Sequence, residues 1–100
     1  MDKQYAAGFF DGAGYIGLGV GYRIEIRIVN TNYKVLELLQ KHWGGGIYKR
    51  KQISGRKQTY DWVIVAKDDT QKFLNDIYPF LVVKKQQIDR TAKLYYELHK

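Results

Sequence analysis

Two stretches in which apolar and polar residues alternate constrain the fold of this chain more than any other feature. The first covers residues 15–28 and turns at Gly21, and the second has strands at 47–53 and 58–66 joined by a polar turn. A period of two is that of a β-strand whose two faces differ, so each stretch predicts a β-hairpin. The apolar positions are Ile16, Leu18, Val20, Ile24, Ile26 and Ile28 in the first hairpin and Tyr60, Trp62 and Ile64 in the last strand.

Helices are predicted before, between and after the two hairpins. Asp2 is a suitable N-cap for the first helix, and Thr31 or Asn32 for the second, which ends at the three glycines 44–46. A third helix ends before a proline, and a last one spans about residues 84–99. The predicted order is α-β-β-α-β-β-α-α in one α+β domain, residues 1–100. The apolar positions assigned to the core in the second and last helices are Val35, Leu36, Leu38, Leu39, Ile88, Leu94 and Leu98.

The composition excludes several classes of protein and favours one class of partner. The chain lacks cysteine, which excludes disulfide frameworks, zinc-thiolate sites and thiol nucleophiles. It has neither a secretory leader nor an apolar run long enough for a membrane span, so we expect an intracellular protein, with archaeal cytoplasm and organelle not distinguished. Its 17 Lys and Arg against 10 Asp and Glu leave a net charge of +7, which favours nucleic acid as a partner.

One face of the predicted sheet collects charged side chains, with the third strand phased by its two lysines. A solvated surface is the ordinary fate of such a face. A two-stranded ribbon also fits the major groove of DNA, and acids among the cations favour base recognition over simple charge neutralisation. The residues assigned to this surface are Arg23, Glu25, Arg27, Lys49, Lys51, Asp61 and Val63, extended by Arg56 and Lys57 in the second turn.

The segment "AAGFFDGAG", residues 6–14, resembles the nine-residue motif of the LAGLIDADG homing endonucleases. The later stretches "IRIVNTNYKVLELLQKHWGGGIYKRK", "YDWVIVAKDDTQKFL" and "YPFLVVKKQQ" resemble that family in the same order, so the resemblance covers nearly the whole chain. It implies an αββαββα fold with a four-stranded, antiparallel, saddle-shaped sheet over DNA. It also implies a homodimer whose motif helices pack together at small residues such as Ala7 and Gly8, with the chain's own core as the alternative location of these residues.

The resemblance also implies a nuclease site with one departure from the family pattern. The eighth motif position holds the metal-binding acid in the family, and here it is Ala13. A methyl group cannot coordinate Mg²⁺, the family's cofactor, although the backbone carbonyl of Gly12 remains a ligand. We therefore expect weakened metal binding and little or no cleavage. The sequence leaves open whether the alanine is natural or was introduced to trap uncut DNA.

Other site residues are implied by their positions in the motifs. Lys84 matches the family's basic residue near the scissile phosphate, and Gln87 follows one turn later. Asn30 matches a polar position that orders solvent, with a turn or cap as its alternative role. The DNA-contacting positions implied are Tyr15, Arg23, Glu25, Arg27, Lys49, Lys51, Asp61 and Val63.

The hypothesis is an intron-encoded, homodimeric homing endonuclease of this type that binds a pseudo-palindromic duplex and is impaired in metal-dependent phosphodiester hydrolysis. One alternative is an intron maturase, which would bind RNA and tolerate loss of the acid. The other is a DNA-binding regulator that never cleaves.

Overall fold

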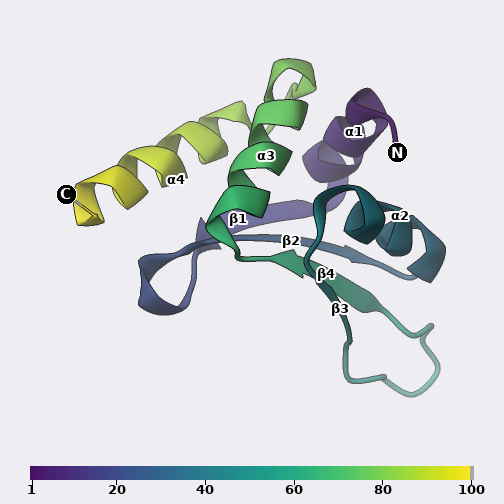
Figure 1. Cartoon of the computed structure of the whole chain (residues 1–100). Helices are drawn as coiled ribbons and strands as arrows, with labels where there is room; N and C mark the ends of the chain where they lie inside the picture. Colours follow the sequence, from purple (N-terminus) through teal and green to yellow (C-terminus); the bar gives the residue numbers. More distant parts are fainter. Residues whose placement is uncertain (100) are drawn as a thin grey trace.

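The chain folds into four helices that lie on one side of a four-stranded sheet (Figure 1). The computed structural model describes residues 1–99, and within them no helix is both long enough and apolar enough to cross a bilayer. The observed order of elements is the predicted one. The elements are α1 (Lys3–Ala13), β1 (Gly14–Leu18), β2 (Ile24–Asn30), α2 (Tyr33–Trp43), β3 (Gly46–Lys49), β4 (Tyr60–Ile64), α3 (Lys67–Ile77) and α4 (Lys85–Leu98), with 3₁₀ turns at Val20–Tyr22 and Tyr78–Phe80.

The sheet has the strand order β1-β2-β4-β3, and all its neighbouring strands are antiparallel. The two hairpins therefore meet through β2 and β4 at the centre. Residues that pair across antiparallel strands point to the same face, and the pairs of Ile26 with Ile64 and of Ile28 with Trp62 lie under the helices. The predicted four-stranded sheet and the assignment of its apolar face are confirmed.

Three details of the hairpins differ from the prediction. The second hairpin is shorter than expected, because β3 ends at Lys49 and β4 begins at Tyr60. Residues 50–57, which lie between the two strands, are exposed. This segment is polar except for Ile53, and Ile53 is exposed as well. Val20 lies in the 3₁₀ turn and is 94% exposed, because the chain has already left β1 to turn at Gly21, where φ is +70°.

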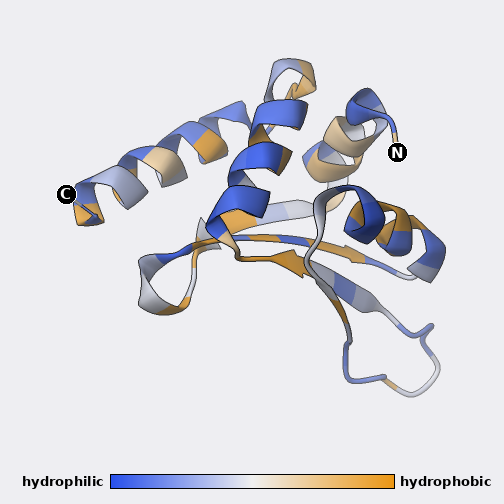
Figure 2. Cartoon of the chain, viewed as in Figure 1, coloured by the Kyte–Doolittle hydropathy of each residue, from blue (hydrophilic) through white to orange (hydrophobic). Residues whose placement is uncertain are grey.

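The core lies between the sheet and the first three helices. Phe73 of α3 is at its centre, with its ring edge-on to Phe10 of α1, Trp43 of α2 and Trp62 of β4 at centroid distances of 5.9, 5.1 and 5.2 Å. The Trp62 indole N–H donates to the Gly44 carbonyl at 2.9 Å, so this large ring is buried without an unpaired donor. Figure 2 shows the apolar residues along the strands and the polar outer surface of α3.

The helix ends follow the predicted caps at α1 and α2. Asp2 accepts hydrogen bonds from the Gln4 and Tyr5 amides, and Asn32 accepts one from the Val35 amide, which selects Asn32 over Thr31 as the N-cap.

The last helix and one position of α2 depart from the predicted core. Leu94 and Leu98 are 46% and 47% exposed, because α4 packs on the rest of the chain through another side, where the His99 ring lies 2.9 Å from the Tyr22 carbonyl. Of its residues, Ile88 is buried and Tyr95 is half-buried. On α2, Leu38 is 48% exposed. The assignment of these three leucines to the core was wrong.

Candidate nucleic-acid interface

The face of the sheet opposite the helices is assembled by strand register. Tyr15 pairs with Arg27, and Arg27 pairs with Val63, which makes one row of outward side chains across β1, β2 and β4. Asp61 belongs to the neighbouring row and pairs with Tyr48 of β3. Because paired residues share a face, Tyr15, Glu25, Arg27, Asp61 and Val63 all lie on the predicted outer face.

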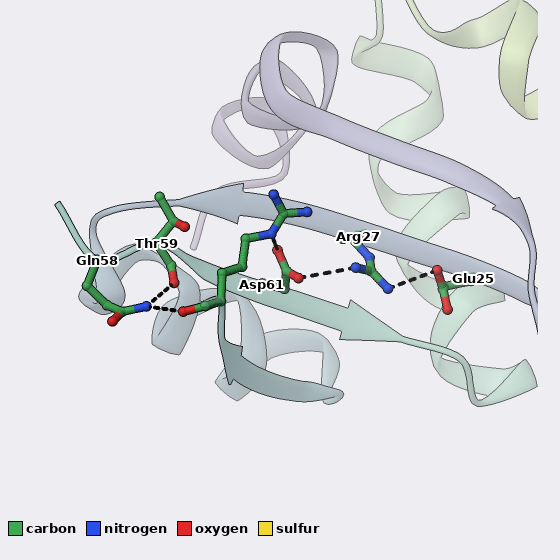
Figure 3. A network of polar contacts seen from close by, with 6 residues as sticks. Glu25, Arg27, Gln58, Thr59 and Asp61 are labelled. Atoms are coloured by element: carbon green, nitrogen blue, oxygen red, sulfur yellow. Dashed lines mark hydrogen bonds and ion pairs between the residues drawn. The ribbon is translucent and has the colours of Figure 1, made fainter. Parts of the chain in front are cut away.

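Four charged side chains on this face form a continuous network (Figure 3). Asp61 accepts from Nη1 of Arg27 at 3.1 Å and from Nε of Arg50 at 2.8 Å, so its two carboxylate oxygens serve two arginines. Nη2 of Arg27 also donates to Glu25 at 3.2 Å. Asp61 is only 8% exposed, and its burial is compensated by these two ion pairs. The face therefore presents fixed donors and acceptors rather than loose charges.

Two tyrosines extend along the outer face from the edge strands. A Cβ added at Gly17 would lie 2.2 Å from the Tyr15 hydroxyl oxygen, and one added at Gly46 would lie 2.6 Å from that of Tyr48. Each tyrosine therefore covers the glycine two residues away on its own strand. Glycine at these positions leaves room for the tyrosine ring. It has no side chain of its own that could contact a ligand on this face.

The register corrects the predicted phase of the third strand. Lys49 pairs with Tyr60 on the helix side of the sheet, and Lys51 lies beyond the strand. Tyr48 points outward in place of Lys49, and Arg50 joins the outer network, although neither was among the predicted site residues. The apolar residue Ile47 indicates the correct phase. It pairs with Trp62 on the helix side of the sheet, so the residues before and after it point to the outer face.

The remaining predicted cations lie at the two ends of the outer face. Arg23 follows the 3₁₀ turn between β1 and β2 and is exposed. Arg56 and Lys57 are exposed in the loop between β3 and β4, where the Arg56 amide donates to the Ile53 carbonyl at 3.0 Å and closes a turn at Gly55. All three are exposed in the connections between strands, so the positive charge extends past both ends of the paired strands.

The acidic residue of the motif helix caps another segment. The Asp11 carboxylate accepts from the amides of Val82, Val83 and Lys84 at 2.7, 3.1 and 3.0 Å. Partial burial acts to raise the pKa of Asp11, but these three donors and the Lys84 charge outweigh it and hold the pKa below its usual value. Asp11 therefore fixes the backbone of Lys84 directly before α4.

The end of α1 does not offer the ligands that Mg²⁺ requires. Ala13 is exposed and has no side-chain oxygen, and the Asp11 carboxylate is held by three amides. Within residues 1–99 no three acidic or histidine side chains are grouped so that they could hold a metal ion. The Gly12 carbonyl alone is a weak ligand set for a hard cation, so the residues present do not fit the metal.

Two predicted polar site residues have different environments. The side-chain oxygen of Asn30 accepts from the Asn32 amide at 2.8 Å, which is the turn role left open by the sequence. Gln87 is exposed on the first turn of α4.

The outer surface of α1 has a shallow, wide-open hollow lined by small and aromatic residues. It has a volume of about 440 Å³ and includes Tyr5, Gly8, Phe9 and Gly12. A Cβ added at Gly8 or Gly12 would have no atom from outside α1 within 4 Å, so no other element of residues 1–99 packs against these glycines. Ala7, by contrast, is fully buried in the chain's own core, which corrects its assignment to a surface that contacts a second subunit.

No family model and no curated protein matches the sequence, whereas solved structures do. The homing endonuclease I-TnaI is 23% identical with a TM-score of 0.76, over 99% of this chain and 76% of that one. The homing endonuclease I-CvuI, in complex with its target in the presence of 2 mM Ca, is 22% identical with a TM-score of 0.74, over 98% of this chain and 68% of that one. The LAGLIDADG homing endonuclease I-GzeII, in complex with a DNA target, is 14% identical with a TM-score of 0.73, over 99% of this chain and 36% of that one. These likenesses establish a shared fold, the one that the motif resemblance implies.

Proposed function

We propose that this chain, which has the LAGLIDADG homing endonuclease fold, binds a specific pseudo-palindromic site in double-stranded DNA as a homodimer. The observation that carries the proposal is the outer face of the sheet, where fixed arginines and carboxylates lie between exposed cationic loops. The net charge of +7 supports attraction to a polyanion. The DNA complexes among the similar structures support the same partner.

The arrangement of charges favours recognition of sequence over simple attraction to phosphate. A surface that neutralises phosphates needs only cations, whereas Glu25 and Asp61 lie among the cations of this face. In the major groove, arginine donates to guanine and a carboxylate accepts from cytosine. The exposed Arg56 and Lys57 are assigned to phosphate contacts that position the ribbon.

Cleavage is the second part of the proposal, and we propose that this chain cleaves DNA slowly or not at all. The Lys84 ammonium stabilises charge on a phosphate that lies near the end of α1, a role for which Asp11 positions its backbone. Divalent metal, Mg²⁺ in the family, would supply the activated water, and this chain lacks the carboxylate that would hold it at position 13. The protein therefore binds its site and leaves it largely uncut.

The experiment that tests the proposal is selection of bound duplexes from a random DNA pool, with calcium present and competitor RNA added. Recovery of one motif built of two inverted half-sites is the expected result. Binding that does not depend on the DNA sequence and is lost at moderate salt concentration would contradict the proposal. Preferential binding of the competitor RNA would favour the intron maturase.

Substitution of Gly8 tests the dimer. We expect Gly8→Leu to leave the monomer folded, because a side chain there meets open space, but to prevent close approach of two α1 helices. The loss should appear as a 1:1 rather than 2:1 complex on the selected duplex in light scattering, with affinity lowered about tenfold or more. Glu37→Leu, which adds the same side chain on the exposed surface of α2, is the control. A Gly8→Leu protein that still binds as a dimer would place the interface elsewhere.

A further inference from the structure

We propose that Arg50 recognises a guanine in each half-site, that Asp61 holds it in position, and that Arg27 serves the network without reading a base. The inference rests on the proposed DNA-binding function and names the residue that would confer part of its specificity. It is drawn from which guanidinium nitrogens are already bonded in the free protein (Figure 3).

The guanidinium of Arg50 keeps both terminal nitrogens available. Its Nε donates to Asp61 at 2.8 Å, and in the described part of the chain neither Nη1 nor Nη2 makes a hydrogen bond. Two parallel N–H groups at the tip of an arginine match O6 and N7 of guanine. With Nε anchored, the fork is oriented before DNA arrives, so less side-chain entropy is lost on binding. The side chain is 48% exposed, so it is accessible to DNA.

Arg27 has the opposite arrangement. Its Nη1 donates to Asp61 and its Nη2 to Glu25, so each terminal nitrogen already has a carboxylate partner. Its side chain is 33% exposed and lies in the row between Tyr15 and Val63. Each of these nitrogens keeps one N–H, but both are held by carboxylates and the side chain is less exposed than that of Arg50, so Arg27 is the less available of the two for guanine. Its role is to balance the two acids.

The backbone at Arg50 is also held, although the residue lies just beyond β3. Its amide donates to the Thr59 carbonyl at 3.0 Å. The Gln58 side-chain amide then donates to the carbonyls of both Arg50 and Thr59, at 2.6 and 2.9 Å (Figure 3). These bonds extend the β3–β4 ladder by one pair. The position of Arg50 is thereby fixed at its backbone and at its side chain.

The test repeats the duplex selection with Arg50→Lys and with Arg27→Lys, each of which keeps the charge and removes the fork. With Arg50→Lys we expect the preference for guanine at one position of each half-site to fall about ten- to a hundredfold. Affinity for duplexes that already lack this guanine should change little. Arg27→Lys, which keeps the cation between Asp61 and Glu25, should lower this preference less than Arg50→Lys does. Arg90→Lys, at an exposed arginine of α4 outside the outer face, is the matched control and should leave every guanine preference in place. An unchanged guanine preference in Arg50→Lys, or its loss in Arg27→Lys alone, would overturn the inference.

Asp61→Asn tests whether Asp61 acts through Arg50. It should weaken the same guanine preference, and in the Arg50→Lys background it should cause no further loss at that position. Relaxation at a different position, or additive losses, would contradict the positioning role. A thermal melt of each variant verifies folding. A wild-type protein that selects a site while Arg50→Lys leaves it unchanged refutes only this inference, whereas a wild-type protein that selects no site refutes the proposed function as well.

Discussion

Ala13→Asp is expected to convert this protein into a metal-dependent nuclease that cuts its selected duplex at least about a hundredfold faster than the unmodified chain. A carboxylate at the exposed end of α1 would supply the hard oxygen ligand that the residues present lack. Stabilisation of the developing charge by several kcal/mol corresponds to a rate factor of about 10² or more. The measurement is cleavage of a labelled duplex carrying the selected site, with magnesium added.

The matched control is Ala13→Asn, which has nearly the same shape but no charge and should stay inactive in magnesium. Both variants should bind the selected site as the unmodified chain does, because position 13 lies at the end of α1 and outside the ion-pair network of the outer face. An Ala13→Asp protein that binds the site and leaves it intact would defeat the nuclease hypothesis. The chain would then be a non-cleaving DNA-binding regulator.

Asp11→Ala is expected to lower the stability of the fold by more than is usual when a polar residue outside the core is replaced. It removes one carboxylate that accepts three backbone hydrogen bonds between segments far apart in the sequence. For a charged acceptor that is partly exposed, we take the total effect as about 2 kcal/mol. In a domain of this size that corresponds to a melting temperature lower by about 8–16 °C. The measurement is thermal unfolding followed by circular dichroism at neutral pH.

The pH dependence of this loss identifies its cause. The pKa of Asp11 is lowered in the folded chain, so its contribution is present above the unfolded pKa and disappears as the pH falls through the lower, folded value. The gap in melting temperature between the unmodified chain and Asp11→Ala should therefore narrow below about pH 4. Asp89→Ala, which removes an exposed acceptor for the Tyr78 hydroxyl, is the control and should melt close to the unmodified chain. A gap that persists unchanged in acid would contradict this account.

The sequence predicted those features that depend on local pattern. The alternation around Ile26 and Trp62 gave the buried face of the sheet, and Asp2 gave a helix start, because periodicity and capping act over a few residues. Contacts between distant segments could not be predicted in this way. The bonds from Asp11 to residues 82–84 and from Arg50 to Asp61 depend on tertiary placement and register.

Leu94 and Leu98 show the limit of periodicity more directly. Their spacing on α4 is that of a core-facing stripe, but a stripe is buried only where another element covers it. This part of α4 packs on the chain through the side that carries Tyr95 and His99, so within the described chain the two leucines stay exposed. Lys49 and Lys51 indicate the wrong face of the third strand for a related reason. The phase of β3 is set by its apolar residue Ile47, which pairs with Trp62, and not by its charged residues.

The central pairing of β2 with β4 has a consequence for how the molecule reaches its native state. Each hairpin closes between neighbouring strands in the sequence, but β2 and β4 are separated by α2 and β3, so joining them requires closure of a long loop. We expect this docking step to be the slow event of folding. Arg27 and Asp61 lie on opposite sides of that seam, so their pairing forms only once the hairpins have joined. A partly assembled chain therefore carries the positive charge and can already form the Arg50–Asp61 pair within the second hairpin, but the network that continues to Arg27 and Glu25 is completed only at the last stage of folding.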